Sequence, residues 1–323
     1  MRAWRWRNRR TRRAITAGAC VVLVACAGSL TLSGTAIGTA VVRGGGGPTW
    51  QGTQVVTYCH EGGQALTMSL FAPSDTGQPA PVVLQVHGGG WQQGQRWVSL
   101  SQSTTATDLV QAGFVVASID YSLAPAHPWP AQIIDAKCAV RYLRANAATL
   151  GLNPGRIAAM GTSAGGQLVS LLGTTGDPGT GSDSTQWDVG PYPNVSSSVS
   201  AVVDEFGPAD LVATGWPRQT VAMIHTVFGA PPGSTNPVLA SASPTLLAAA
   251  GDPPFLILQG TSDQVVPETQ SRAFAQRLTS VGVPVRLVMV AHGQHGLATT
   301  DEYPGPVALS TLIMQFLVQT LPH

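Results

Sequence analysis

The sequence predicts an α/β fold with a mostly parallel central sheet and helices on both faces. Two observations support this prediction. Short apolar runs alternate with helical patterns along the chain, and the runs themselves are rich in Val, Ile and Leu with little interruption. Such runs are typical of strands buried on both faces of a parallel sheet. A chain of 323 residues, 44% of them hydrophobic, is long enough to bury this core in one domain.

Each expected element has its own pattern. Two runs, 55–58 and 65–71, predict an antiparallel pair at the sheet edge, with a turn over 61–64. Buried strands are predicted over 82–86, 114–119, 157–160, 199–203, 255–258 and 285–290. Apolar residues at helical spacing predict helices over 131–150 and 269–281. Long loops above the carboxyl ends of the strands, where α/β enzymes bind ligands, are predicted over 173–198 and 211–253.

The N-terminal segment, residues 1–42, has the pattern of an export signal. Arginines cluster before Ala14, and an uncharged, largely apolar stretch follows. Its most apolar part, 14–27, is shorter than the ~20 residues that a membrane-spanning helix needs. Signal cleavage, retention as a membrane anchor, and lipidation of Cys26 in a lipobox-like Leu-Val-Ala-Cys sequence all fit these residues. The protein is therefore expected to be secreted or attached to the cell envelope through its N-terminus.

A flexible linker is predicted over residues 43–49, which include four consecutive glycines, so residues 50–323 are expected to form one folded domain. This domain contains two cysteines, Cys59 and Cys138, which in an exported protein can form a disulfide. Two buried free thiols are the alternative. From Ala14 onward the net charge is −6. A mildly acidic domain without a basic stripe argues against nucleic-acid binding.

The sequence Gly-Thr-Ser-Ala-Gly at 161–165 places Ser163 between an apolar run and a helix-compatible stretch. A nucleophile on a tight strand-to-helix turn needs small neighbours, because its backbone is strained and crowded. The start of the following helix directs free amides, including that of Ala164, toward the reacting oxygen. The pattern predicts that Ser163 is a nucleophile.

A second motif, His-Gly-Gly-Gly-Trp at 87–91, follows the apolar run 82–86. Consecutive glycines allow the backbone to approach a substrate and to turn its amides toward an oxyanion. The amides of Gly88 and Gly89, together with that of Ala164, are therefore predicted to form an oxyanion hole. An ordinary glycine-rich turn is the alternative interpretation.

These two motifs, with Asp-Tyr-Ser-Leu-Ala-Pro at 120–125, resemble the hormone-sensitive-lipase and acetyl-esterase branch of the α/β-hydrolases. The resemblance extends over residues 54–320 and implies the α/β-hydrolase fold, with its order of Ser, then acid, then His. Asp263 matches the acid, although it could instead be a turn-forming aspartate. His295, followed by Gly and Leu, matches the histidine better than His292, which is followed by Gly and Gln. Ser122 departs from the branch, which has arginine there; this affects a surface ion pair rather than the chemistry.

The resemblance implies a serine hydrolase that cleaves carboxylic esters through an acyl-enzyme, with residues 50–323 as its catalytic domain. Short-acyl and carbohydrate esters both fit. No cofactor and no metal are expected, because zinc-type ligand spacing and a P-loop lysine are both missing from the sequence. One alternative is a prolyl-oligopeptidase-like peptidase, but the chain is too short for a propeller and has Ala164 where those enzymes often have tyrosine. The other is a catalytically inactive binding protein, against which the intact Ser, Asp and His argue.

Overall fold

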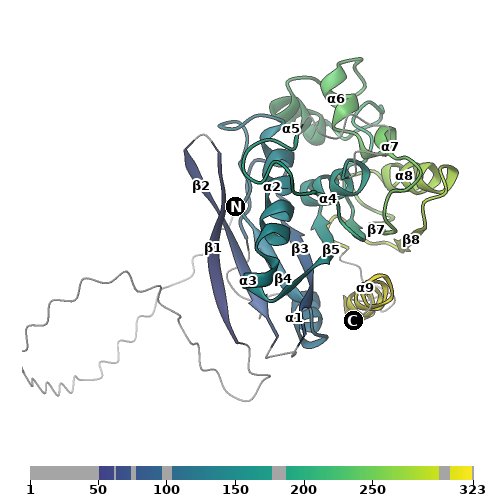
Figure 1. The fold of residues 1–323 in the computed structure, drawn as a ribbon. Helices are drawn as coiled ribbons and strands as arrows, with labels where there is room; N and C mark the ends of the chain where they lie inside the picture. Colours follow the sequence, from purple (N-terminus) through teal and green to yellow (C-terminus); the bar gives the residue numbers. More distant parts are fainter. Residues whose placement is uncertain are drawn as a thin grey trace, which may run out of the picture. The chain divides into compact units, whose positions relative to one another are not determined.

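A computed structural model describes residues 51–61, 63–73, 78–96, 104–176, 187–297 and 306–321 (Figure 1). The expected export segment 1–42, with Cys26, and the expected linker 43–49 lie outside these residues. The described residues fall within one compact unit of the chain, Thr39–His323. None of the helices among them is long and apolar enough to cross a membrane.

The described residues contain an eight-stranded sheet with the order β1-β2-β4-β3-β5-β6-β7-β8 (Figure 1). Its strands are β1 Gln51–Glu61, β2 Gln64–Ala72, β3 Ala80–Val86, β4 Val115–Ile119, β5 Leu152–Thr162, β6 Val202–Glu205, β7 Phe255–Gly260 and β8 Val285–Val290. β2 is antiparallel to both β1 and β4, whereas the other neighbours are parallel. The predicted mostly parallel sheet with an antiparallel pair at one edge is confirmed.

The helices cover both faces of this sheet. They are α1 Thr104–Gln111, α2 Ala131–Ala145, α3 Ala147–Leu150, α4 Ala164–Thr174, α5 Arg218–Phe228, α6 Pro237–Ser241, α7 Pro244–Leu247, α8 Glu268–Ser280 and α9 Pro306–Thr320. In β3, Leu84 packs into a core with side chains of α2, α4 and α8, whereas its neighbour Val83 packs into a second core with α1 and α9. Burial on alternate sides explains why the strand sequences are apolar without interruption.

Several elements differ from their sequence-based predictions. The expected helix 131–150 is divided into α2 and α3 at Asn146, whose side-chain amide donates to the carbonyl oxygen of Tyr142 (2.9 Å). The strand expected over 199–203 begins only at Val202. The segment 211–253 contains α5, α6 and α7 rather than loop alone. Both α6 and α7 have proline in their first turn, a position that favours the start of a helix. In a segment rich in Gly, Pro, Ser and Thr, these prolines could not be distinguished from loop prolines.

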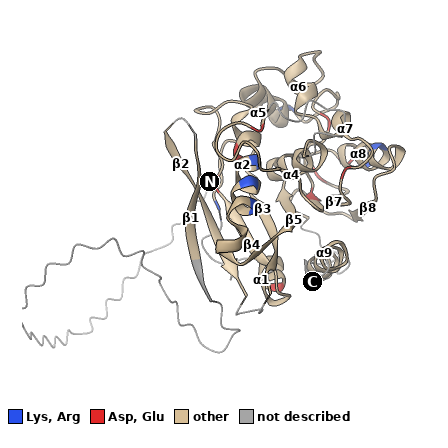
Figure 2. Cartoon of the chain, in the orientation of Figure 1, with Lys and Arg blue, Asp and Glu red and all other residues tan. Residues whose placement is uncertain are grey.

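Helix α2 carries several basic residues (Figure 2), and their side chains bond to other parts of the domain. Lys137 is fully buried and donates to the carbonyl oxygen of Thr175 and to Asp188 (2.8 and 3.1 Å). Arg144 donates to the carbonyl oxygens of Pro154 and Ser198 (3.0 and 2.7 Å). These bonds attach the start of β5 and the segment between α4 and β6 to α2.

Cys59 of β1 and Cys138 of α2 are joined by a disulfide in the structure, across a sequence separation of 79 residues. Alkylation of the denatured protein before reduction is expected to leave both cysteines unmodified in peptide mass spectrometry. Reduction should lower the free energy of unfolding by about 2–4 kcal/mol, because the bond restricts a long loop of the unfolded chain. Alkylation of both cysteines without reductant would contradict the prediction.

Candidate active site

Ser163 lies on the sharp turn between β5 and α4 and has a positive φ of 53°. Small residues on either side make this turn sterically possible. A Cβ at Gly161 would overlap the carbonyl oxygen of Gly165, and one at Gly165 would overlap that of Val86 at the end of β3. The amide of Ser163 donates to the carbonyl oxygen of Glu205 in β6 (2.8 Å). The strained nucleophile turn expected from the sequence is therefore present and is held by both neighbouring strands.

His295 lies in the segment after β8, and its ring joins two other predicted residues. Nε2 lies 2.9 Å from Oγ of Ser163, and Nδ1 lies 2.8 Å from Oδ2 of Asp263. A carboxylate only accepts, so Nδ1 donates to Asp263 and the neutral ring accepts the Ser163 hydroxyl proton at Nε2. The second candidate, His292, is exposed, and its backbone amide donates to Oγ1 of Thr261 (2.9 Å). The structure thus brings Ser163, His295 and Asp263 together without His292.

Asp263 follows β7, and its side chain is completely buried. Burial alone would raise the pKa of this carboxyl. Hydrogen bonds from His295 and from the amides of Val265 and Val266 outweigh burial, so the pKa lies below its ordinary value. Asp263 is therefore ionised at neutral pH and can stabilise a positive charge on His295.

The glycines after β3 lie directly beside the serine. A Cβ at Gly88 would lie 2.9 Å from the carbonyl oxygen of Thr162 and 3.2 Å from Cβ of Ser163. Gly89 has a φ of 109°, and its carbonyl oxygen accepts the amides of residues 92 and 93 in a tight turn. Ala164 is the first residue of α4, where a helix leaves its amide without an internal partner. The three predicted oxyanion amides therefore belong to segments that flank Ser163.

Further contacts brace this glycine turn. The Tyr121 hydroxyl donates to the carbonyl oxygen of His87 (3.1 Å), and the two rings stack with centroids 4.2 Å apart. Nε1 of Trp91 donates to Gln167 of α4 (3.0 Å). The side chain of Met223 in α5 packs against Gly90, so that an added Cβ would meet its sulfur. The turn is thereby fixed by the segment that follows β4, by α4 and by α5.

Sequence reasoning did not identify two neighbours of this site. Phe206, directly after β6, has a φ of 50°, and its ring meets that of His295 edge to face at 4.8 Å. Gln259 of β7 donates to Asp263 (3.2 Å). A polar residue at the end of the apolar run 255–258 was a usable signal for Gln259, whereas nothing in the sequence marks Phe206.

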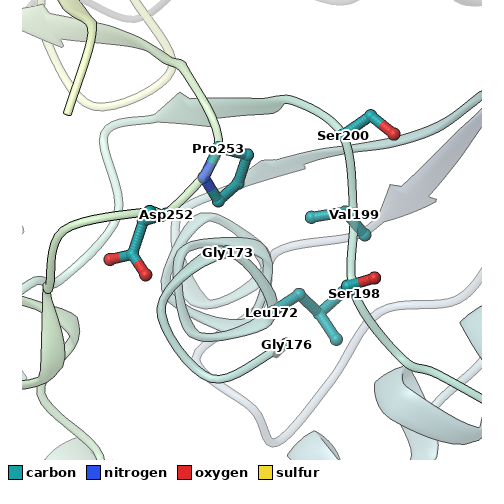
Figure 3. Close-up of a pocket in the computed structure, with 9 residues that line it drawn as sticks. Leu172, Gly173, Gly176, Ser198, Val199, Ser200, Asp252 and Pro253 are labelled. Carbon is teal, nitrogen blue, oxygen red and sulfur yellow. The ribbon is translucent and has the colours of Figure 1, made fainter. Parts of the chain in front are cut away.

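Two cavities in the described part of the chain have linings that include none of Ser163, Asp263 and His295. One, of about 390 Å³, is at the edge of the sheet where β3 and β4 end, and it is lined by Gln64, Gln95, Asp120, Tyr121 and His127 among others. The other, of about 280 Å³, lies between the end of α4 and the segments preceding β6 and β7 (Figure 3). Because parallel strands begin at one edge and end at the other, this second cavity is at the edge opposite Ser163.

A BD-FAE family model matches residues 68–278, which is more than half of the chain. The chain belongs to the BD-FAE family of α/β-hydrolases. Among characterised proteins, this BD-FAE chain is similar to esterase LipC of Mycobacterium tuberculosis, with 35% identity over 63% of this chain and 49% of LipC. Esterase LipQ of the same organism is 30% identical over 68% of this chain and 51% of LipQ. The chain thus spans about half the length of these relatives.

Solved structures agree with the BD-FAE assignment. A truncated carbohydrate esterase from gut microbiota superposes with a TM-score of 0.72 and 25% identity, covering 87% of this chain and 100% of that one. Thermogutta terrifontis esterase 2 with bound propionate superposes with a TM-score of 0.67 and 25% identity, covering 84% of this chain and 97% of that one. The predicted α/β-hydrolase fold and the resemblance to its esterase branch are confirmed.

Proposed function

We propose that this BD-FAE protein is a serine esterase that hydrolyses carboxylic esters through an acyl-enzyme. The observation that carries the proposal is the unbroken series of hydrogen bonds from Asp263 through His295 to the Ser163 hydroxyl. This is the arrangement in which a histidine can remove a serine proton while a buried carboxylate fixes its orientation. The esterases LipC and LipQ support the same reaction class.

Acylation begins when Oγ of Ser163 attacks the ester carbonyl carbon and its proton moves to Nε2 of His295. The carbonyl oxygen becomes an oxyanion, to which the amides of Gly88, Gly89 and Ala164 donate. Collapse of this intermediate breaks the bond to the alcohol oxygen, which takes the proton from His295. Asp263 stabilises the imidazolium while it exists.

Deacylation repeats these steps with water in place of Ser163. Water attacks the acyl carbon and gives a proton to His295, and the same amides hold the second oxyanion. The bond to Oγ of Ser163 then breaks, Ser163 regains its proton from His295, and the carboxylic acid leaves. Each turnover therefore consumes one ester and one water and restores the enzyme.

The substrates that we propose are esters with short acyl groups, including esters of carbohydrates. Met223 packs on the glycine turn beside the oxyanion amides and limits the room there. The cavity of about 390 Å³ at the same edge of the sheet has amide, carboxylate and imidazole side chains in its lining, which suit a hydroxyl-rich alcohol. The similar structures of a carbohydrate esterase and of a propionate-bound esterase support the same two substrate classes.

A series of p-nitrophenyl esters tests this proposal. We expect kcat/KM to be greatest between acetate and butyrate and to fall by more than about tenfold for decanoate, because a confined acyl site discriminates by whole methylene groups. A fluorophosphonate probe should label wild-type protein at Ser163. A protein that is folded but neither labelled nor active would instead be a binding protein of this fold, and an undiminished rate with decanoate would contradict the short-acyl proposal.

A further inference from the structure

Oδ2 of Asp263 accepts two side-chain donors in the structure. One is Nδ1 of His295 at 2.8 Å, and the other is Nε2 of Gln259 at 3.2 Å. The other carboxylate oxygen accepts the amides of Val265 and Val266 at 2.8 and 2.9 Å. Gln259 therefore completes a set of four donors around a side chain that has no contact with solvent.

Gln259 is the penultimate residue of β7 and is fully buried. Its Oε1 accepts the hydroxyl of Ser271 in α8 at 2.8 Å, and Ser271 is also buried. A carboxylate only accepts, so the atom of the Gln259 amide that faces Asp263 must be the nitrogen, and Oε1 is left to accept from Ser271. Nε2 also reaches the carbonyl oxygens of Gly260 and Val266 (3.1 and 3.3 Å), so every polar atom of the Gln259 side chain has a partner.

We propose that Gln259 is a positioning residue for the Asp263 carboxylate and that Ser271 holds Gln259 in the required orientation. The inference rests on the proposed esterase function and extends its hydrogen-bonded series by two members. Rotation of the carboxylate about its Cβ–Cγ bond would break the contact with Gln259 as well as the two amide contacts. Oδ2 therefore stays directed at Nδ1 of His295, which in turn keeps Nε2 directed at Ser163.

Replacement of Gln259 by methionine keeps the length of the side chain and removes its donor. We expect kcat for p-nitrophenyl acetate to fall roughly tenfold to a hundredfold with KM nearly unchanged, because a small misplacement of a reacting group has effects of this size. The acid limb of the kcat/KM profile should also move to higher pH. With one donor fewer, the Asp263 carboxylate attracts protons more strongly, including the proton of the imidazolium that it bonds, so the neutral base is lost at a higher pH.

Gln85 provides a matched control. It is the penultimate residue of β3, is 5% exposed and lies three strands from β7 in the sheet. Gln85→Met should show whatever loss of stability follows from removing a buried strand glutamine, while kcat and the pH profile stay at wild-type values. Ser271→Ala should give a smaller loss of kcat than Gln259→Met, with the pH profile moved in the same direction.

The inference is overturned if Gln259→Met folds, as judged by circular dichroism, and has the kcat and pH profile of Gln85→Met. If Gln259→Met does not fold, Ser271→Ala decides the question, and wild-type kcat and pH dependence in that variant overturn the inference. Failure of the esterase proposal itself is distinguishable, because the wild-type protein would then neither hydrolyse p-nitrophenyl acetate nor react with a fluorophosphonate.

Discussion

Ser163→Ala and His295→Ala are each expected to lower kcat for p-nitrophenyl acetate by several powers of ten, and the double variant should be hardly worse. The two residues act in one proton transfer, so removing either already abolishes that step. Asp263→Asn should also lose activity, because the amide can turn its N–H₂ group toward Nδ1 of His295 and so stabilise the tautomer with its proton on Nε2, which cannot accept from Ser163. Steady-state kinetics on proteins with wild-type circular dichroism provide the measurement.

His292→Ala is the internal control for this series. His292 belongs to the same segment as His295, but its side chain is exposed. Its removal should leave kcat close to wild type. If His292→Ala abolished hydrolysis while a folded His295→Ala kept it, the assignment of the base would be wrong in spite of the contact with Ser163.

Gly161→Ala is expected to have the second largest effect. The added Cβ would overlap the carbonyl carbon and oxygen of Gly165. These are backbone atoms, which cannot move without displacing Ser163. A displacement of the order of 1 Å is sufficient to reduce turnover by about a hundredfold. The overlap should also lower the free energy of unfolding by about 1–3 kcal/mol, in line with overpacked cores. Kinetics and denaturant unfolding measure the two effects.

Gly155→Ala in the same strand is the matched control. A Cβ at Gly155 would meet only the side-chain oxygen of Asn153, at an ordinary 3.5 Å. Activity and stability of this variant should stay near wild type. Equal tolerance of alanine at Gly155 and Gly161 would show that the turn around Ser163 is much less crowded than the structure indicates.

The sequence contained most of the information needed for the sheet. Strands such as β3 and β7 are buried on both faces, so their composition reflects their environment directly. The juxtaposition of Ser163, Asp263 and His295 could also be anticipated, because the carboxyl ends of parallel strands meet at one edge. A tight turn also restricts which residues can occupy it. The turn around Ser163 requires small residues at Gly161 and Gly165, and this requirement is visible in the sequence as a motif.

Contacts that depend on tertiary packing could not be predicted from composition or from motifs. The ring of Phe206 reaches His295 from the position directly after β6, a strand of only four residues whose sequence resembles any buried segment. Helix α5 lies in a segment rich in loop-forming residues, and its stability comes from packing of side chains such as Ile224 and Val227 on the core. Propensity alone does not determine such a helix.

In the sequence, the connection from β6 to β7 lies between Ser163 and the other two residues of the proposed triad. It carries α5, which contacts the glycine turn through Met223 and Val265 through the Thr220 hydroxyl (2.8 Å). Both of its ends are fixed by strands paired within the sheet. Closing a flexible loop of twice the length costs only about 0.6 kcal/mol more in entropy. Insertions and deletions in the part of this connection beyond α5 are therefore expected to cost the fold little, so its length can change during evolution while Ser163, Asp263 and His295, which lie outside it, keep their geometry.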